Sequence, residues 1–142
     1  MIKLYSFLLI TLFPTFILAQ STSTQIINEV CDGRIFTRCE QIPSLKISKE
    51  AFEDSLKTFL KERKALKRDF QITYRFIVTK DSQILELSRV DGDMPKENII
   101  REALLYYAHL WMSGVQNTYK VCAYAKAQIE LANENLSITI TQ

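Results

Sequence analysis

The sequence predicts an α+β protein in which a three-stranded antiparallel sheet is covered on one face by two helices, in the order helix, strand, strand, helix, strand. Apolar residues spaced three and four positions apart predict the two helices, in 48–66 and 93–111. Alternation of apolar and polar residues predicts a hairpin over 70–90 and a longer last strand over 119–131. The chain of 142 residues is 47% apolar and 24% charged, which is typical of one compact domain.

The first helix has a clear start and a strongly basic end. Ser48 can cap it, Glu50 falls in its first turn, and Phe52 opens the apolar stripe. At its end Glu62 is surrounded by Lys61, Arg63, Lys64, Lys67 and Arg68. These cations either form a patch for anionic lipid, cell-wall polymer or an acidic partner, or simply face solvent and oppose the negative end of the helix dipole.

The hairpin and the second helix follow directly. Residues 70–78 and 84–90 are the two strands, joined by a turn over 80–83, and a second turn is expected at 91–93. Asp93 and Pro95 are typical of a helix start, and the apolar stripe of that helix continues to Trp111.

The last strand, from Tyr119 to Leu131, alternates over thirteen residues. Its inward positions include three consecutive small side chains, which leave room for a helix to approach closely; they are Ala123, Ala125 and Ala127. Cys122 falls on the outward face, as an exposed free thiol, a site for bonding a second chain, or a shielded and inert thiol.

The amino terminus is typical of an export signal. Lys3 is followed by an apolar stretch over 4–19 that ends at Ala19, a small residue suited to cleavage. The stretch is shorter than the roughly 20 residues of a spanning helix and is interrupted by Pro14. We therefore expect a signal peptide over 1–19, with an uncleaved anchor in the inner membrane as the alternative and as the one case of membrane contact.

The remaining chain divides at Ser48 into a leader over 20–47 and a domain over 48–142. Residues 21–25 are expected to be mobile. Three cysteines outside the cytoplasm allow at most one internal disulfide, and Cys31 with Cys39 is the expected pair because a short loop there would tether the leader. No spacing among the cysteines and His109 is typical of zinc, so no metal is expected.

Composition also limits the function. The net charge of +2 lacks the basic excess of nucleic-acid-binding proteins, so no nucleic acid is expected as a partner. One histidine and three glycines provide little material for a catalytic triad or a phosphate loop. We expect neither an enzyme, nor catalytic residues, nor a cofactor.

Residues 39–131 resemble the carboxy-terminal domain of TonB-type energy-transducing proteins, of the kind common in Bacteroidetes. The resemblance is carried by RCEQIPSLKISKEAFEDSLKTFL, by ITYRFIVTKDSQILELSRV, and by WMSGVQNTYKVCAYAKAQIEL after the second helix. Ser113 stands where the family has a proline before glycine, and Asp81-Ser82 replaces the usual Asp-Gly of the hairpin. Related chains have a second cysteine where this one has Ala51, which favours Cys31 as the partner of Cys39.

The resemblance implies a periplasmic protein-binding module in TonB-dependent transmembrane transport. Such a domain captures an extended segment of an outer-membrane receptor, or of another envelope protein, as an added strand beside its final strand. We expect that strand at a sheet edge, with a docking site formed by Tyr119, Val121, Ala123, Tyr124, Ala125, Lys126 and Ala127. The same edge would allow a homodimer, through the strand or through Cys122. The alternative is a secreted envelope structural or inhibitor protein with the same small α+β layer and no transport role.

Overall fold

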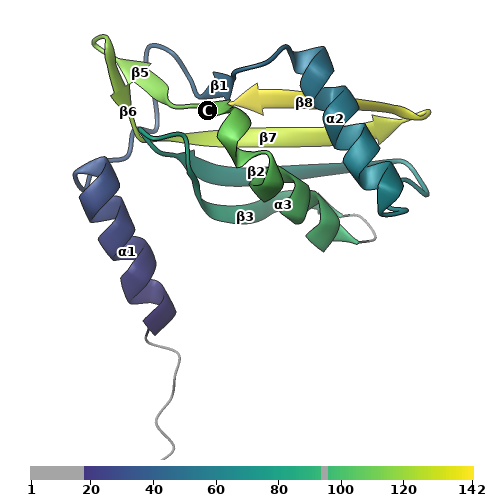
Figure 1. Cartoon of the computed structure of the whole chain (residues 1–142), viewed down its shortest axis with the longest axis horizontal. Coiled ribbons are helices and arrows are strands. Elements are labelled where there is room, and N and C mark those ends of the chain that lie inside the picture. The colour runs from purple at the N-terminus through teal and green to yellow at the C-terminus, as the bar shows by residue number, and fades with distance from the viewer. Residues whose placement is uncertain (1–17, 94–95) are drawn as a thin grey trace, which may run out of the picture.

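The computed structural model describes residues 18–93 and 96–142 (Figure 1). The expected export signal over residues 1–19 therefore lies almost wholly outside the described residues. The chain forms an α+β protein whose main sheet has four antiparallel strands in the order β3-β2-β7-β8. These strands are β2 (Phe70–Val78), β3 (Ile84–Asp93), β7 (Ala123–Ala132) and β8 (Asn135–Thr141).

The α+β class is confirmed, but the sheet has one strand more than the three predicted. The chain reverses after β7 at Asn133 and Glu134, which both have positive φ, the conformation that a two-residue hairpin turn requires. β8 then pairs with β7 from Ala132–Asn135 to Lys126–Thr141. Two short pairs complete the strands: β1 (Ser44–Leu45) with β4 (Trp111–Met112), and β5 (Gly114–Gln116) with β6 (Tyr119–Val121).

Helices α2 (Lys49–Glu62) and α3 (Glu97–Tyr106) lie side by side on one face of the sheet (Figure 1). The predicted cap of α2 is confirmed, because Ser48 Oγ accepts a hydrogen bond from the Ala51 N–H at 3.1 Å. The buried side of α2 is the predicted apolar stripe, consisting of Phe52, Leu56, Phe59 and Leu60.

The predicted bounds of the second helix are wrong at both ends. Asp93 ends strand β3, and the residue before α3 is Lys96, which has a left-handed backbone and no side-chain cap. At the other end α3 stops at Tyr106, and a 3-10 turn (Ala108–Leu110) redirects the chain. Trp111 therefore lies in β4, opposite Leu45.

Trp111 is nevertheless at the centre of the core between the helices and the sheet. Its side chain is fully buried, and its ring contacts those of Phe76 and Phe52 edge-on, with centroids 4.9 and 6.1 Å apart. The predicted inward alanines of the last strand are also buried, two of them, Ala125 and Ala127, in this core. Small side chains at these positions leave room for the large rings.

A smaller cluster lies on the opposite face of the sheet, at the end nearest α1 (Leu18–Cys31). Its centre is a disulfide between Cys31 and Cys122, with Cα atoms 5.5 Å apart. Ile77 of β2 packs against this bond, and Ile27, Val30, Ile35, Leu85 and Tyr124 surround it. The disulfide thus ties α1 to the sheet.

This bond corrects the expected cysteine pairing. Cys39 is not bonded to Cys31; its thiol lies 3.1 Å from the carbonyl oxygen of Gln41 and contacts the side chain of Gln142. Cys122 is buried and already bonded within the chain, so it is neither an exposed thiol nor available to lock a dimer. Residues 21–25 belong to helix α1 and do not form an irregular leader.

Tyr74 gives the core a measurable pH dependence. Burial, and then the nearby carboxylate of Glu97, raises its pKa to about 12, whereas an unfolded chain ionises tyrosine near pH 10. Between these values the unfolded state loses a proton that the folded state keeps, so stability falls as the pH rises from about 10 to 12, by up to about 3 kcal/mol.

We expect Tyr74→Phe to remove this part of the alkaline destabilisation. The measurement is the free energy of unfolding in urea at a series of pH values from neutral to strongly alkaline, for both proteins. Tyr119→Phe is the matched control, because Tyr119 is 74% exposed. Equal alkaline slopes for the wild-type and Tyr74→Phe proteins would contradict the assignment.

Candidate functional site

The expected docking strand is not a single strand at a sheet edge. Tyr119 and Val121 belong to β6, in the small hairpin with β5, whereas Ala123 to Ala127 open β7. β7 is an inner strand: β2 pairs with it on one side from Val78–Ala123 to Phe70–Leu131, and β8 pairs on the other from Lys126 onward.

The first residues of β7, before the β8 pairing begins, are also occupied. Phe36 forms a parallel bridge beside Ala123. The Phe36 N–H donates to the carbonyl oxygen of Cys122 at 2.9 Å, and the Tyr124 N–H donates to the carbonyl oxygen of Phe36 at 3.0 Å. The expectation that this strand lies at the edge is therefore wrong, because two other parts of the chain take up its backbone groups.

The main sheet has two outer strands, β3 and β8. β3 is irregular: its register with β2 shifts between Thr73 and Tyr74 and again between Arg75 and Ile77, and Glu86 has a positive φ of 52°. Bulges of this kind twist an edge and disfavour pairing with a further strand. β8, in contrast, pairs with β7 without any register shift, so it is the regular edge.

One hydrogen bond shows which residues of β8 direct their backbone N–H and C=O groups away from β7. The Ile138 N–H donates to Glu53 Oε1 of α2 at 2.8 Å, so it points away from β7. Residues along a strand alternate in the direction of their backbone groups, so Leu136 and Ile140 also direct N–H and C=O outward. The edge thus presents backbone groups at three alternate positions.

Side chains of α2 cover one part of this edge. Four residues at i, i+4 spacing follow one side of the helix: Lys49, Glu53, Lys57 and Lys61. Glu53 takes the Ile138 N–H and forms an ion pair with Lys49 at 3.6 Å, and Lys57 Nζ donates to the carbonyl oxygen of Glu134 at 2.6 Å. Charged side chains that occupy edge groups in this way are a common protection against unwanted strand pairing.

An apolar groove lies beside the carboxy-terminal half of β8. It has a volume of about 310 Å³, and β8 forms one wall while the segment leading into α2 forms the other. The lining residues are Leu45, Ile47, Lys49, Ile138, Thr139 and Ile140. A groove with one wall of backbone donors and acceptors and one wall of aliphatic side chains can accommodate an extended chain.

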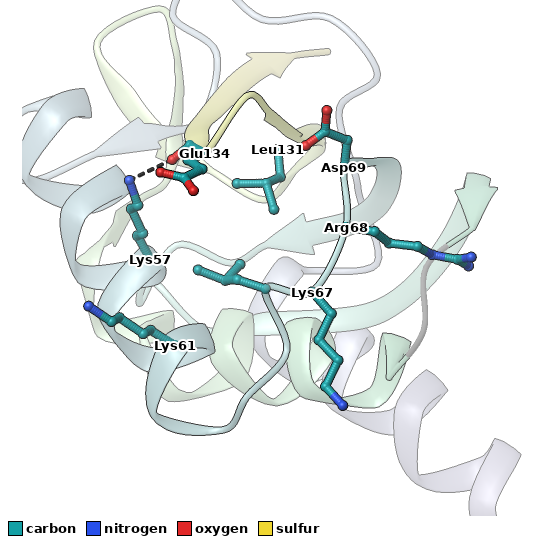
Figure 2. A pocket seen from close by; sticks show the side chains of 8 residues that line it. Lys57, Lys61, Lys67, Arg68, Asp69, Leu131 and Glu134 are labelled. Carbon is teal, nitrogen blue, oxygen red and sulfur yellow. Dashed lines mark hydrogen bonds between the residues drawn. The ribbon is translucent and has the colours of Figure 1, made fainter.

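A second hollow, of about 450 Å³, lies beyond the β7–β8 turn, at the end of α2 (Figure 2). Lys57 and Lys61 approach it from α2, and Lys67 and Arg68 from the segment that leads into β2. Leu66, Leu131, Asp69 and Glu134 complete the lining. The basic end predicted from the sequence is therefore concave.

The described residues do not gather into a cluster that could bind a metal ion at either site. Within residues 18–93 and 96–142 no group of three or more histidine, cysteine or acidic side chains could hold a metal ion. In the same part of the chain, every helix is too short or too polar to cross a membrane. The groove offers backbone hydrogen bonding and aliphatic contact, and the hollow offers aliphatic contact and a rim of four basic and two acidic residues.

Glu53, Ile138 and Ile140 are site residues that the sequence did not predict. Leu136, Ile138 and Ile140 alternate with more polar residues in the sequence, and their place at the outer edge follows from the β7–β8 turn. Comparisons with protein-family models, with curated proteins and with solved structures found no match.

Proposed function

We propose that this chain is an exported, TonB-like protein-binding module that docks an extended segment of an outer-membrane receptor by strand addition in TonB-dependent transport. The docking edge is β8, because β7 is an inner strand. The observation that carries the proposal is the combination of a regular outer strand with the apolar groove beside it. The resemblance of residues 39–131 to the TonB carboxy-terminal domain supports the choice of partner.

In the docked state, the incoming strand pairs with the outward backbone groups of Leu136, Ile138 and Ile140. Its alternate side chains enter the groove against Leu45 and Ile47, which gives the interaction its selectivity. The incoming carbonyl takes the Ile138 N–H in place of Glu53, so Glu53 acts as a competitor that the ligand must displace.

Hydrogen exchange tests the location of docking. Addition of peptides from the plug segments of candidate receptors is expected to protect the amides of Leu136, Ile138 and Ile140, while those of β3 stay unchanged. Protection confined to β3, or none at any strand for the whole set of peptides, would contradict the proposal. Recovery of a protease or a cell-wall polymer instead of a receptor, in crosslinking from envelope fractions, would favour the alternative of an inhibitor or structural protein.

Glu53→Ala tests the competition at the edge. Without the carboxylate, the Ile138 N–H is free for the ligand. We therefore expect the affinity for a bound peptide to rise by about five- to tenfold. This change corresponds to one net hydrogen bond of about 1 kcal/mol. Isothermal titration calorimetry measures the change. Glu50→Ala is the matched control, because Glu50 carries the same charge in the first turn of α2 and is exposed. If the Glu53→Ala protein binds the peptide as tightly as the wild-type protein or more weakly, Glu53 does not compete with the ligand.

A further inference from the structure

Charge is strongly segregated along this chain. Residues 57–68 contain six of the eighteen lysines and arginines and only one of the sixteen acidic residues. The rest of the chain has twelve basic and fifteen acidic residues, so it is net negative. The positive charge of the protein is thus concentrated at the end of α2 and in the segment that follows it.

Two of these six cations have partners for their side chains. Lys57 is held by the carbonyl oxygen of Glu134, and Arg63 forms an ion pair with Glu102 at 3.1 Å while covering the ring of Phe59. The side chains of Lys61, Lys64, Lys67 and Arg68 form no hydrogen bond or ion pair with any residue that the structure describes, and all four residues are exposed. Lys61, Lys67 and Arg68 border the hollow of Figure 2 from two sides.

The floor of the hollow has a different character from its rim. Leu131 is 5% exposed, and Leu66 is partly buried against the same core. Figure 2 shows the side chain of Leu131 facing the hollow between Glu134 and Asp69, with Lys61 and Lys67 on the other side and extending outward. The hollow therefore offers an aliphatic contact next to three unpaired cations, with Asp69 and Glu134 on the other part of its rim.

We propose that this hollow binds an acidic segment of a partner protein that carries an aliphatic side chain between its carboxylates. The aliphatic side chain contacts Leu66 and Leu131, and the flanking carboxylates pair with Lys61, Lys67 and Arg68. Such a segment matches both the three unpaired cations and the apolar floor. The inference does not depend on strand addition, because the hollow lies beyond the turn that joins β7 to β8.

A membrane surface fits this site less well than a peptide does. A bilayer is flat, whereas the aliphatic contact is recessed in a concave surface. Figure 2 also shows Lys67 and Arg68 extending in different directions, so they do not form one plane of charge. A peptide, in contrast, can enter the hollow and present its carboxylates to cations on different sides.

The test uses a fluorescently labelled pentapeptide, Asp-Glu-Leu-Glu-Asp, and the full chain at low ionic strength, with anisotropy as the readout. We expect saturable binding that weakens by at least about tenfold in the Lys61→Glu/Lys67→Glu double variant. Lys120→Glu, which makes the same kind of charge change at an exposed residue of β6, is expected to leave binding unchanged. Replacing the central leucine of the probe with alanine is expected to weaken binding by about fivefold to tenfold.

Several results would overturn the proposal. A loss of binding in the Lys120→Glu protein equal to that in the double variant would indicate attraction by net charge alone. An affinity for the alanine probe equal to that for the leucine probe would show that the aliphatic contact does not contribute to binding. Competition by millimolar inorganic phosphate as strong as by the peptide would indicate a general anion site. If the protein sediments with vesicles of phosphatidylglycerol and phosphatidylcholine, and the Lys61→Glu/Lys67→Glu protein does not, the ligand of the hollow is a membrane surface and not a peptide.

Discussion

Replacing Cys122 with serine is expected to lower the free energy of unfolding by about 4 kcal/mol. The Cys31–Cys122 bond closes a loop with a sequence separation of 91 residues. A cross-link over so long a loop removes much conformational entropy from the unfolded chain, by about 4 to 5 kcal/mol in the chain-entropy model. The substitution also places a hydroxyl group in a cluster built from Ile77 and its aliphatic neighbours.

Urea unfolding under oxidising conditions measures the change. Cys31→Ser is expected to have nearly the same effect, because either substitution breaks the same bond. Cys39→Ser is the matched control and is expected to change stability little, since its thiol is free. An equally large loss in Cys39→Ser, or a wild-type protein that is as stable in reductant as without it, would contradict the observed pairing.

Trp111→Ala is expected to cost about 3 to 5 kcal/mol of stability, the usual range for removing a large buried aromatic side chain. The indole is fully buried and contacts Phe76 of the sheet and Phe52 of α2, so its loss leaves a cavity between the two layers. Unfolding monitored by far-ultraviolet circular dichroism measures the effect without relying on tryptophan fluorescence.

Trp111→Phe separates the packing contribution from the polar one. The Nε1 atom of Trp111 is the only buried side-chain nitrogen or oxygen without a hydrogen-bond partner in the described part of the chain. Phenylalanine keeps the ring contacts and removes this unpaired N–H, so we expect it to cost less than half as much as alanine. A loss in Trp111→Phe equal to that in Trp111→Ala would mean that the indole shape, and not the ring contacts, is what the core requires.

The sequence was sufficient for elements whose signal is local. The alternation over residues 70–90 predicted β2 and β3, and the stripe beginning at Phe52 predicted α2 together with its Ser48 cap. Trp111 continued the spacing of α3, yet it lies in a strand, because burial of the indole between the layers requires the chain to turn after Tyr106. A helical spacing alone does not reveal where the helix stops.

The candidate site depends on relations between distant parts of the chain. Nothing near Cys31 indicates a partner 91 residues away. The spacing of Glu53 and Lys57 on α2 is visible in the sequence, but their hydrogen bonds to Ile138 of β8 and to the turn residue Glu134 follow only from how the helix lies beside that strand. Because β8 pairs with β7, the free edge of the sheet is β8 and not the strand over 119–131 that the sequence predicted as the edge.

The position of the disulfide also determines how the protein carries a mechanical load. Tension applied to α1 reaches the sheet through the sulfur of Cys122, one residue before β7, and bypasses the segment between Cys31 and β2. β7 begins at the end of the sheet where α1 lies (Figure 1), so the tension enters the sheet at the start of an inner strand that β2 and β8 hold. Many backbone hydrogen bonds must then break together, whereas in the reduced protein the same tension would first extend the segment that follows α1.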